Sequence, residues 1–222
     1  MDTKRKNMLT VLLAVVLVAA AVGGIIFFKS SAAADAAQAG SAPSDSAQAA
    51  AGTWQKVEPS AANLDAFSFF KSPAALCVGK EGEMNAMTIG WGQLGNAWGK
   101  ETITVYVRQS RFTKHLMDKY DTFTVEVFPK EKASVLEYFG TKSGRDEDKI
   151  KGSGLTLKTM ENGAPAFEEG AVILECRKLT AVELNAAAMK QELTDQFYTK
   201  DKDNGNFHTA YTAEITAVWV KK

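Results

Sequence analysis

The chain has 222 residues, and its 26 Lys and Arg balance its 26 Asp and Glu, so its formal net charge is zero. A neutral chain argues against a nucleic-acid partner, because non-specific nucleic-acid binding requires a basic surface that displaces phosphate counterions. Two Cys and two His are too few for a disulfide framework and leave little for a zinc site. Length and composition are those of one globular domain, or at most two small ones.

The N-terminal segment predicts a membrane anchor. A basic cluster at 4–6 precedes an uncharged apolar run of 21 residues at 8–28, and a helix of that length spans about 30 Å, the thickness of the hydrocarbon core of a bilayer. The positive-inside rule then predicts a cytoplasmic N-terminus and an extracytoplasmic C-terminal domain. We expect residues 1–29 to be a single-pass signal anchor in the cell membrane. A cleaved signal peptide is the alternative, because A-x-A-like sites occur at 32–36.

Residues 30–53 have the composition of a flexible linker. Eleven of these 24 residues are Ala, five are Ser, and only Asp35 and Asp45 are charged. The segment has no large apolar side chain whose burial would offset the loss of chain entropy. We therefore expect a tether, followed by a folded domain at 54–222.

Hydrophobic periodicity predicts that this domain is mainly β, with short helices. Strands are expected at 74–78, 86–91, 103–107, 122–128, 171–184 (one long strand or a bent pair) and 207–220, and helices at 111–119, 131–139 and 146–151. Strands that follow one another with brief helical interruptions indicate an antiparallel β-barrel with helical decorations.

A glycine-rich stretch follows the second predicted strand. Gly90, Gly92 and Gly95 match the G-x-G-x-x-G pattern of dinucleotide-binding proteins. That pattern requires a following helix, whereas a strand is predicted next, so we interpret the match as fortuitous. Trp91 and Trp98 in this stretch are expected to fill the barrel core, although a flat ligand ring could instead stack on them.

The start of the predicted helix 111–119 offers an anion site. Ser110 precedes the helix, Arg111 opens it and Thr113 lies in its first turn. Free backbone N–H groups, hydroxyls and the guanidinium groups of Arg111 and Arg108 suit a phosphate monoester. A solvated helix face is an equally good interpretation of the two arginines.

A second candidate anion site is the segment 143–146 together with Lys149. Here we favour a capping box of Ser143 with Asp146 over a ligand site. Cys77 and Cys176 both fall on predicted strands and are expected to be buried thiols; a disulfide is the alternative in an oxidising compartment.

Several sequence blocks closely resemble the flavin reductase-like family, in its flavoredoxin branch. The blocks are Asn-Ala-Met-Thr-Ile-Gly-Trp-Gly at 85–92, Trp-Gly-Lys at 98–100, Val-Tyr-Val-Arg-Gln-Ser-Arg-Phe-Thr at 105–113, and later matches at 141–150, 174–179, 208 and 214–215. The resemblance covers about 64–222 and implies an FMN-binding split β-barrel, usually a homodimer with the flavin near the subunit interface. One departure is Gln109, which stands where many relatives have Pro.

The resemblance also implies which residues bind FMN. Arg111 and Thr113 would hold the phosphate, Thr88 would line the flavin, and Ser143, Arg145 and Lys149 would complete the phosphate or ring-edge contacts. The full set expected to bind the cofactor is Asn85, Met87, Thr88, Ile89, Gly90, Trp91, Arg108, Ser110, Arg111, Thr113, Ser143, Gly144, Arg145 and Lys149. No metal site and no catalytic side chain are predicted.

The expected function is that of a membrane-anchored oxidoreductase moving electrons through bound FMN between a donor and an acceptor. The donor is a nicotinamide cofactor or, because the predicted topology separates the domain from the cytoplasm, a quinone-linked or cytochrome partner. The alternatives are a non-catalytic flavin-binding or electron-carrier module and a structural split barrel that has lost flavin.

Overall fold

The computed structural model describes residues 52–199 and 204–222. The predicted anchor at 1–29 and the linker up to residue 51 lie outside the described residues. Within the part of the chain that is described, no helix is long and apolar enough to cross a membrane.

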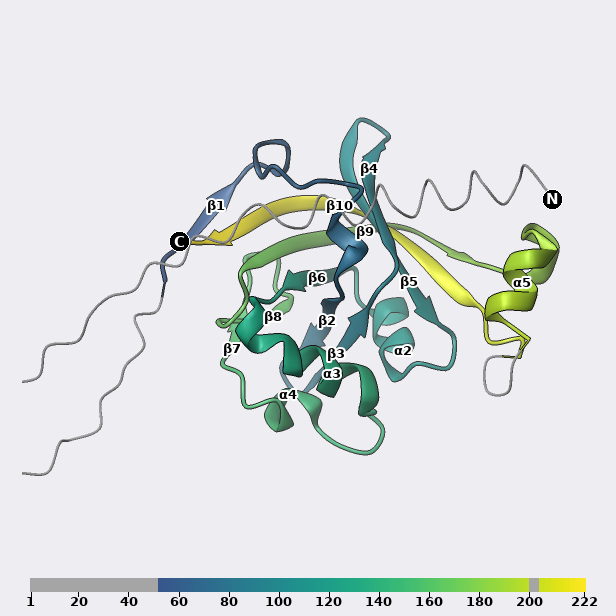
Figure 1. Ribbon diagram of the computed structural model, residues 1–222. Helices are drawn as coiled ribbons and strands as arrows, with labels where there is room; N and C mark the ends of the chain where they lie inside the picture. Colours follow the sequence, from purple (N-terminus) through teal and green to yellow (C-terminus); the bar gives the residue numbers. More distant parts are fainter. Residues whose placement is uncertain (1–51, 200–203) are drawn as a thin grey trace, which may run out of the picture. The chain divides into compact units, whose positions relative to one another are not determined.

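The described chain is built around one eight-stranded antiparallel sheet (Figure 1). Its strand order is β3-β2-β6-β9-β10-β5-β4, and β1 pairs with β10. The strands are β1 (Trp54–Val57), β2 (Ala74–Lys80), β3 (Glu83–Ile89), β4 (Gly92–Ala97), β5 (Lys100–Arg108), β6 (Thr122–Val127), β9 (Val172–Glu183) and β10 (His208–Lys221). A separate hairpin consists of β7 (Leu157–Thr159) and β8 (Pro165–Phe167).

Short helices interrupt the strands. They are α2 (Phe112–Lys119), α3 (Ala133–Thr141), α4 (Lys149–Gly152) and α5 (Gln191–Phe197), with 3-10 turns η1 (Pro59–Ala61), η2 (Phe69–Lys71), η3 (Lys130–Lys132) and η4 (Ala186–Ala188). Figure 1 shows α2, α3 and α4 around one end of β3, and α5 beyond the ends of β9 and β10 that lie away from β1. The prediction of a mainly β domain with short helices is confirmed.

The six predicted strands and the first two predicted helices are present, with ends displaced by at most three residues. The sequence at 171–184 forms one continuous strand rather than a bent pair. The capping-box interpretation of Ser143 with Asp146 is wrong. The third helix begins at Lys149, and its N-cap is Asp148, whose carboxylate accepts hydrogen bonds from the backbone N–H groups of Ile150 and Lys151.

Strand β2 is buried on both faces, which explains its unbroken apolar sequence. Ala74, Leu76 and Val78 belong to the larger hydrophobic cluster of the sheet. Cys77, on the opposite face, packs in a second cluster with Phe139 of α3. This second cluster explains why α3 lies against β2 and β3, where the candidate site is found.

The prediction of two buried thiols is confirmed. Cys77 and Cys176 are both free and fully buried. They belong to different hydrophobic clusters, Cys77 to the second and Cys176 to the larger one.

The glycine-rich stretch forms a β-hairpin, which the sequence analysis missed. β4 and β5 pair from Gly92↔Val105 to Ala97↔Lys100, leaving a two-residue turn in which Trp98 and Gly99 have φ of +54° and +68°. Positive φ at both turn residues matches the twist of the flanking strands. Strands rather than a helix follow the glycines, so the interpretation of the G-x-G-x-x-G match as fortuitous is confirmed. The expectation that Trp91 and Trp98 fill the core is wrong, because they are 41% and 67% exposed.

Candidate functional site

Three cavities lie in a row along β3, β5 and the helices at one end of the sheet. The first, called the cationic cavity, has a volume of about 130 Å³ and is lined by Asn85, Met87, Thr88, Ser110, Arg111, Phe112, Thr113, Phe139, Gly140, Thr141, Lys142, Ser143, Gly144, Arg145 and Lys149. The middle cavity, of about 190 Å³, is lined by Met87, Thr88, Ile89, Gly90, Trp91, Tyr106, Arg108, Arg111 and His208. The apolar cavity, of about 520 Å³, is lined by Phe70, Gly90, Trp91, Gly92, Tyr106, Leu184, Met189, Leu193, Phe197 and Tyr198.

The three cavities share lining residues and are called the path below. Met87, Thr88 and Arg111 line both the cationic and the middle cavity. Trp91 and Tyr106, with Gly90, line both the middle and the apolar cavity. The three cavities are therefore neighbours along one side of the sheet.

The cationic cavity carries an unbalanced positive charge. Arg111, Lys142, Arg145 and Lys149 line it, and no Asp or Glu is among its described lining residues. Lys142 lies 3.6 Å from Glu147, while no ion pair is found for the other three cations in the described chain. Of these cations only Lys149 is buried, and Arg111, Lys142 and Arg145 are exposed at the cavity mouth. A buried ammonium without a carboxylate is costly unless an anion joins it, and the exposed cations add donors for the same anion. The donor set therefore fits a phosphate group.

Lys149 is the most buried of these cations, with 3% of its surface exposed. Its ammonium donates hydrogen bonds to the backbone carbonyls of Phe139 (2.7 Å) and Lys142 (3.1 Å). Burial, followed by the nearby charge of Arg111, lowers the pKa of Lys149 to about 8. An ammonium has three donors, so one remains for a ligand after the two carbonyls are bound.

The start of α2 forms another wall of the cationic cavity. Arg111 is the N-cap residue and makes no side-chain capping hydrogen bond, so the first backbone N–H groups of α2 are not capped by this side chain. The buried amide of Asn85 donates to the hydroxyl of Thr113 at 2.8 Å, which ties β3 to this helix. The positive end of the helix dipole adds to the cationic character of this cavity.

The loop between α3 and α4 closes the cavity. Arg145 donates to the backbone carbonyl of Ser110 at 3.0 Å, and its guanidinium lies 5.9 Å from the ring centroid of Phe112. A Cβ atom on Gly144 would lie 2.5 Å from the Phe112 ring and 2.7 Å from the side-chain oxygen of Asn85. Only glycine allows the loop to approach β3 and α2 so closely.

The hydroxyl of Thr88 is engaged by α3. It donates a hydrogen bond to the backbone carbonyl of Leu136 and lies between the cationic and middle cavities. This bond joins the end of β3 to the helix above it, so the wall shared by the two cavities is held from both sides.

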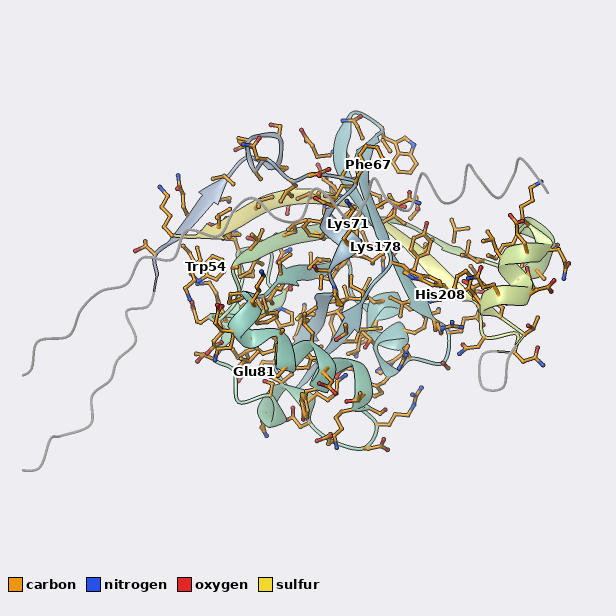
Figure 2. All side chains as sticks on the ribbon, viewed as in Figure 1. Trp54, Phe67, Lys71, Glu81, Lys178 and His208 are labelled. Atoms are coloured by element: carbon orange, nitrogen blue, oxygen red, sulfur yellow. The ribbon has the colours of Figure 1, made fainter. Side chains whose placement is uncertain are left out.

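The middle cavity contains the groups that β5 and β10 place beside β3. Alternation along β5 puts Tyr106 and Arg108 on the face opposite the buried Val105 and Val107. His208 begins β10 on the side of α5 (Figure 2) and pairs in register with Arg108. The ring centroids of His208 and Trp91 lie 5.1 Å apart.

Arg108 lines the middle cavity and not the cationic cavity. Its guanidinium donates to the backbone carbonyls of Asn206 (3.0 Å) and Phe197 (3.3 Å) and stacks at 5.3 Å from the ring centroid of Tyr198. Arg108 and Arg111 both line the middle cavity, and only Arg111 also lines the cationic cavity. That the two arginines hold one anion stays a prediction. The hydrogen bonds of Arg108 connect β5 to the segment around α5.

The fourteen residues predicted to bind a cofactor all line the cationic or the middle cavity. Ile89, Gly90, Trp91 and Arg108 line the middle cavity but not the cationic one. That these residues bind FMN stays a prediction.

Sequence reasoning missed other lining residues, namely Phe112, Phe139, Gly140, Thr141 and Lys142 in the cationic cavity and Tyr106 in the middle cavity. The alternation of β5 was a usable signal for Tyr106, which lies on the same strand face as Arg108.

Residues 67–222, more than half of the chain, match the flavin reductase like domain family. The chain belongs to this family. No curated protein matches the sequence of this flavin reductase-like protein.

Solved structures show the same fold as this flavin reductase-like protein. Flavoredoxin from Methanosarcina acetivorans is 22% identical, with a TM-score of 0.53 over 68% of each chain. Flavoredoxin of Desulfovibrio vulgaris (Miyazaki F) is 20% identical, with a TM-score of 0.53 over 68% of this chain and 69% of that one. An FMN-binding domain of a flavin reductases-like enzyme from Shewanella baltica OS155 is 15% identical, with a TM-score of 0.54 over 77% and 78% of the two chains. The split β-barrel expected from the sequence is therefore confirmed as the fold.

Proposed function

We propose that this protein binds FMN and uses it to move electrons between a donor and an acceptor. FMN is the cofactor that the family and the FMN-binding structural relatives support. The observation that carries the proposal is the cationic cavity, where Arg111, Arg145 and Lys149 meet without a carboxylate among the described lining residues. It adjoins the middle cavity, where the flavin ring would lie.

Different residues would bind the phosphate and the ring of FMN. Arg111, Lys149 and the first turn of α2 would hold the phosphate by charge and hydrogen bonds. Thr88 and Trp91 would bound the ring in the middle cavity. FMN supplies the redox chemistry when bound, by accepting and returning two electrons, whereas the protein orients it and limits its contact with water. No side-chain acid or base is required for this role.

The test is the affinity of the purified full chain for FMN and for riboflavin, which has the same ring without the phosphate. Arg111→Gln should weaken FMN binding by about ten- to a hundredfold, because a hydrogen bond to a charged group contributes about 1.5–3 kcal/mol. Riboflavin affinity should fall much less, because Arg111 also lines the middle cavity but riboflavin has no phosphate for it to bind. Arg177→Gln is the matched control, because Arg177 is an exposed arginine of β9 outside the cavities. Equal FMN affinity in wild type and Arg111→Gln would contradict the placement of the phosphate.

Turnover distinguishes an oxidoreductase from a flavin-binding module without activity of its own. We propose the oxidoreductase, and steady-state reduction of bound FMN by NADH, NADPH and artificial donors tests it. Absence of turnover with every donor, in a protein that retains FMN, would favour the electron-carrier alternative. A purified chain that takes up no FMN would favour a structural barrel.

We also propose that residues 1–29 anchor the protein in the cell membrane, that the domain is extracytoplasmic and that it forms a homodimer. The apolar run after a basic cluster supports the anchor and its orientation. Protease added to intact cells should digest the domain, and light scattering of detergent-solubilised protein should give twice the chain mass. A protected domain would overturn the topology, and a monomer would overturn the dimer.

A further inference from the structure

We propose that the apolar cavity binds the head group of a quinone, a flat, neutral carbonyl compound, as the redox partner of the flavin. This inference rests on the proposed function and specifies its substrate class. It depends on the lining of the apolar cavity, on its continuity with the middle cavity and on the hydroxyl groups in its wall.

The lining selects a neutral and flat ligand. Aromatic side chains from four parts of the chain line it, including Phe70, Trp91 and Phe197, together with Leu193 and Met189. None of its described lining residues is charged. Its volume of about 520 Å³ lies within the range of small-molecule sites, about 300–1,000 Å³.

The missing charge argues against a nicotinamide dinucleotide in this cavity. Such a ligand carries a pyrophosphate, which proteins bind with cationic side chains or helix N-termini. The cations that line the path belong to the cationic and middle cavities, and none of them lines the apolar cavity. A quinone head group has no charge to neutralise, so its transfer into an apolar cavity is favourable.

The cavity contains hydroxyl groups suited to carbonyl oxygens. Tyr106, in the wall shared with the middle cavity, accepts a hydrogen bond from the amide of Gln93 at 3.0 Å. Its own O–H is then available to donate to a ligand carbonyl. Tyr198 lines the apolar cavity and is hydrogen-bonded at 2.7 Å to His208, which lines the middle cavity. A hydrocarbon would leave the O–H of Tyr106 without an acceptor, whereas a ligand carbonyl can accept from it.

Continuity with the middle cavity allows electron transfer. Gly90 lines both cavities, and a Cβ atom there would have no neighbour within 4 Å, so no side chain stands between the two cavities at this residue. In the balanced reaction, two electrons and two protons pass from reduced FMN to the quinone, giving oxidised FMN and a hydroquinol. The reverse transfer balances equally, so the same contact serves a hydroquinol donor.

The experiment uses the full chain in detergent and menadione, a naphthoquinone without a tail. Menadione binding is followed by tryptophan fluorescence, since Trp91 lines the cavity. Electron transfer is followed by reoxidation of pre-reduced, FMN-loaded protein under anaerobic conditions. Leu193→Lys places a cation in the cavity wall from α5, and Met189→Lys does so from the loop after η4. Leu157→Lys is the matched control, because Leu157 is 41% exposed, against 40% for Leu193, and lies on β7 outside the three cavities of the path.

We expect both cavity variants to weaken menadione binding and to slow reoxidation at least tenfold, with unchanged FMN affinity and an unchanged control. Equal menadione affinity in wild type and Leu193→Lys overturns the inference. The inference is also overturned if Leu193→Lys converts a dimer into a monomer and has no other effect, because a second copy of the chain then covers the cavity. FMN binding is measured separately, and its absence would contradict the proposed function. Menadione binding to the FMN-free protein would still test the apolar cavity in that case.

Discussion

The pKa of Lys149 makes FMN affinity depend on pH in a predictable direction. In the ligand-free protein, burial and the charge of Arg111 lower this pKa to about 8, while Glu147 and Cys77 act in the opposite direction. A phosphate dianion beside the ammonium stabilises its charged form and raises the pKa again. FMN should therefore bind more tightly to protein in which Lys149 is protonated, and the affinity should fall as pH rises through 8.

The size of the effect follows from the fraction of charged Lys149. With a pKa of about 8, roughly nine-tenths of the lysine is charged at pH 7 and roughly one-tenth at pH 9. FMN affinity should fall about tenfold between these values, equivalent to about 1.4 kcal/mol. The phosphate has its second pKa near 6, so its own charge changes little over this interval.

The assay is FMN titration of the apoprotein at intervals from pH 7 to pH 9, with riboflavin in parallel. Lys149→Met should bind FMN more weakly at pH 7 and lose the pH dependence above it. Lys151→Met is the matched control, because the Lys151 side chain on the same helix is 87% exposed, and it should retain the wild-type profile. Circular dichroism confirms that each variant is folded. A flat wild-type profile, or the same slope with riboflavin, would refute the location of the phosphate beside Lys149.

Three further predictions concern the fold around the site. Glu126 is fully buried, and burial raises its pKa to about 8 even though its carboxylate accepts a hydrogen bond from the backbone N–H of Phe167. Because the folded state holds this proton and the unfolded state releases it near 4.5, the free energy of unfolding should fall between pH 4.5 and 8, by up to about 1.4 kcal/mol per unit. Glu126→Gln should remove that slope in denaturant titrations, and an unchanged slope would contradict the assignment. Gly144→Ala should displace the loop from Phe112 and weaken FMN binding severalfold by titration, since the added methyl has no space; wild-type affinity would count against the tight packing. Trp98→Ser, at an exposed hairpin turn, should change the free energy of unfolding by less than about 0.5 kcal/mol, and a larger loss in chemical denaturation would disprove this expectation.

Hydrophobic periodicity in the sequence was sufficient to predict the strands that have one buried face and one partly exposed face. In β5, buried Ile103, Val105 and Val107 alternate with partly exposed residues, and the pattern is visible without a structure. Elements without such a pattern were missed. β4 is rich in glycine and polar residues, and α5 buries only Thr194, so neither has an apolar periodicity that predicts its conformation.

The sequence also identified the segments that form the candidate site, through its resemblance to the flavin reductase-like family and the anion-binding potential at the start of α2. Their joint position depends on contacts between distant residues, such as Asn85 with Thr113 and Arg145 with Ser110. Local sequence reports which face of an element is apolar, but not which distant element covers it. Only the tertiary structure therefore decided that Lys149 is buried among carbonyls, that Arg108 lines the middle cavity but not the cationic one, and that an apolar cavity adjoins the middle one.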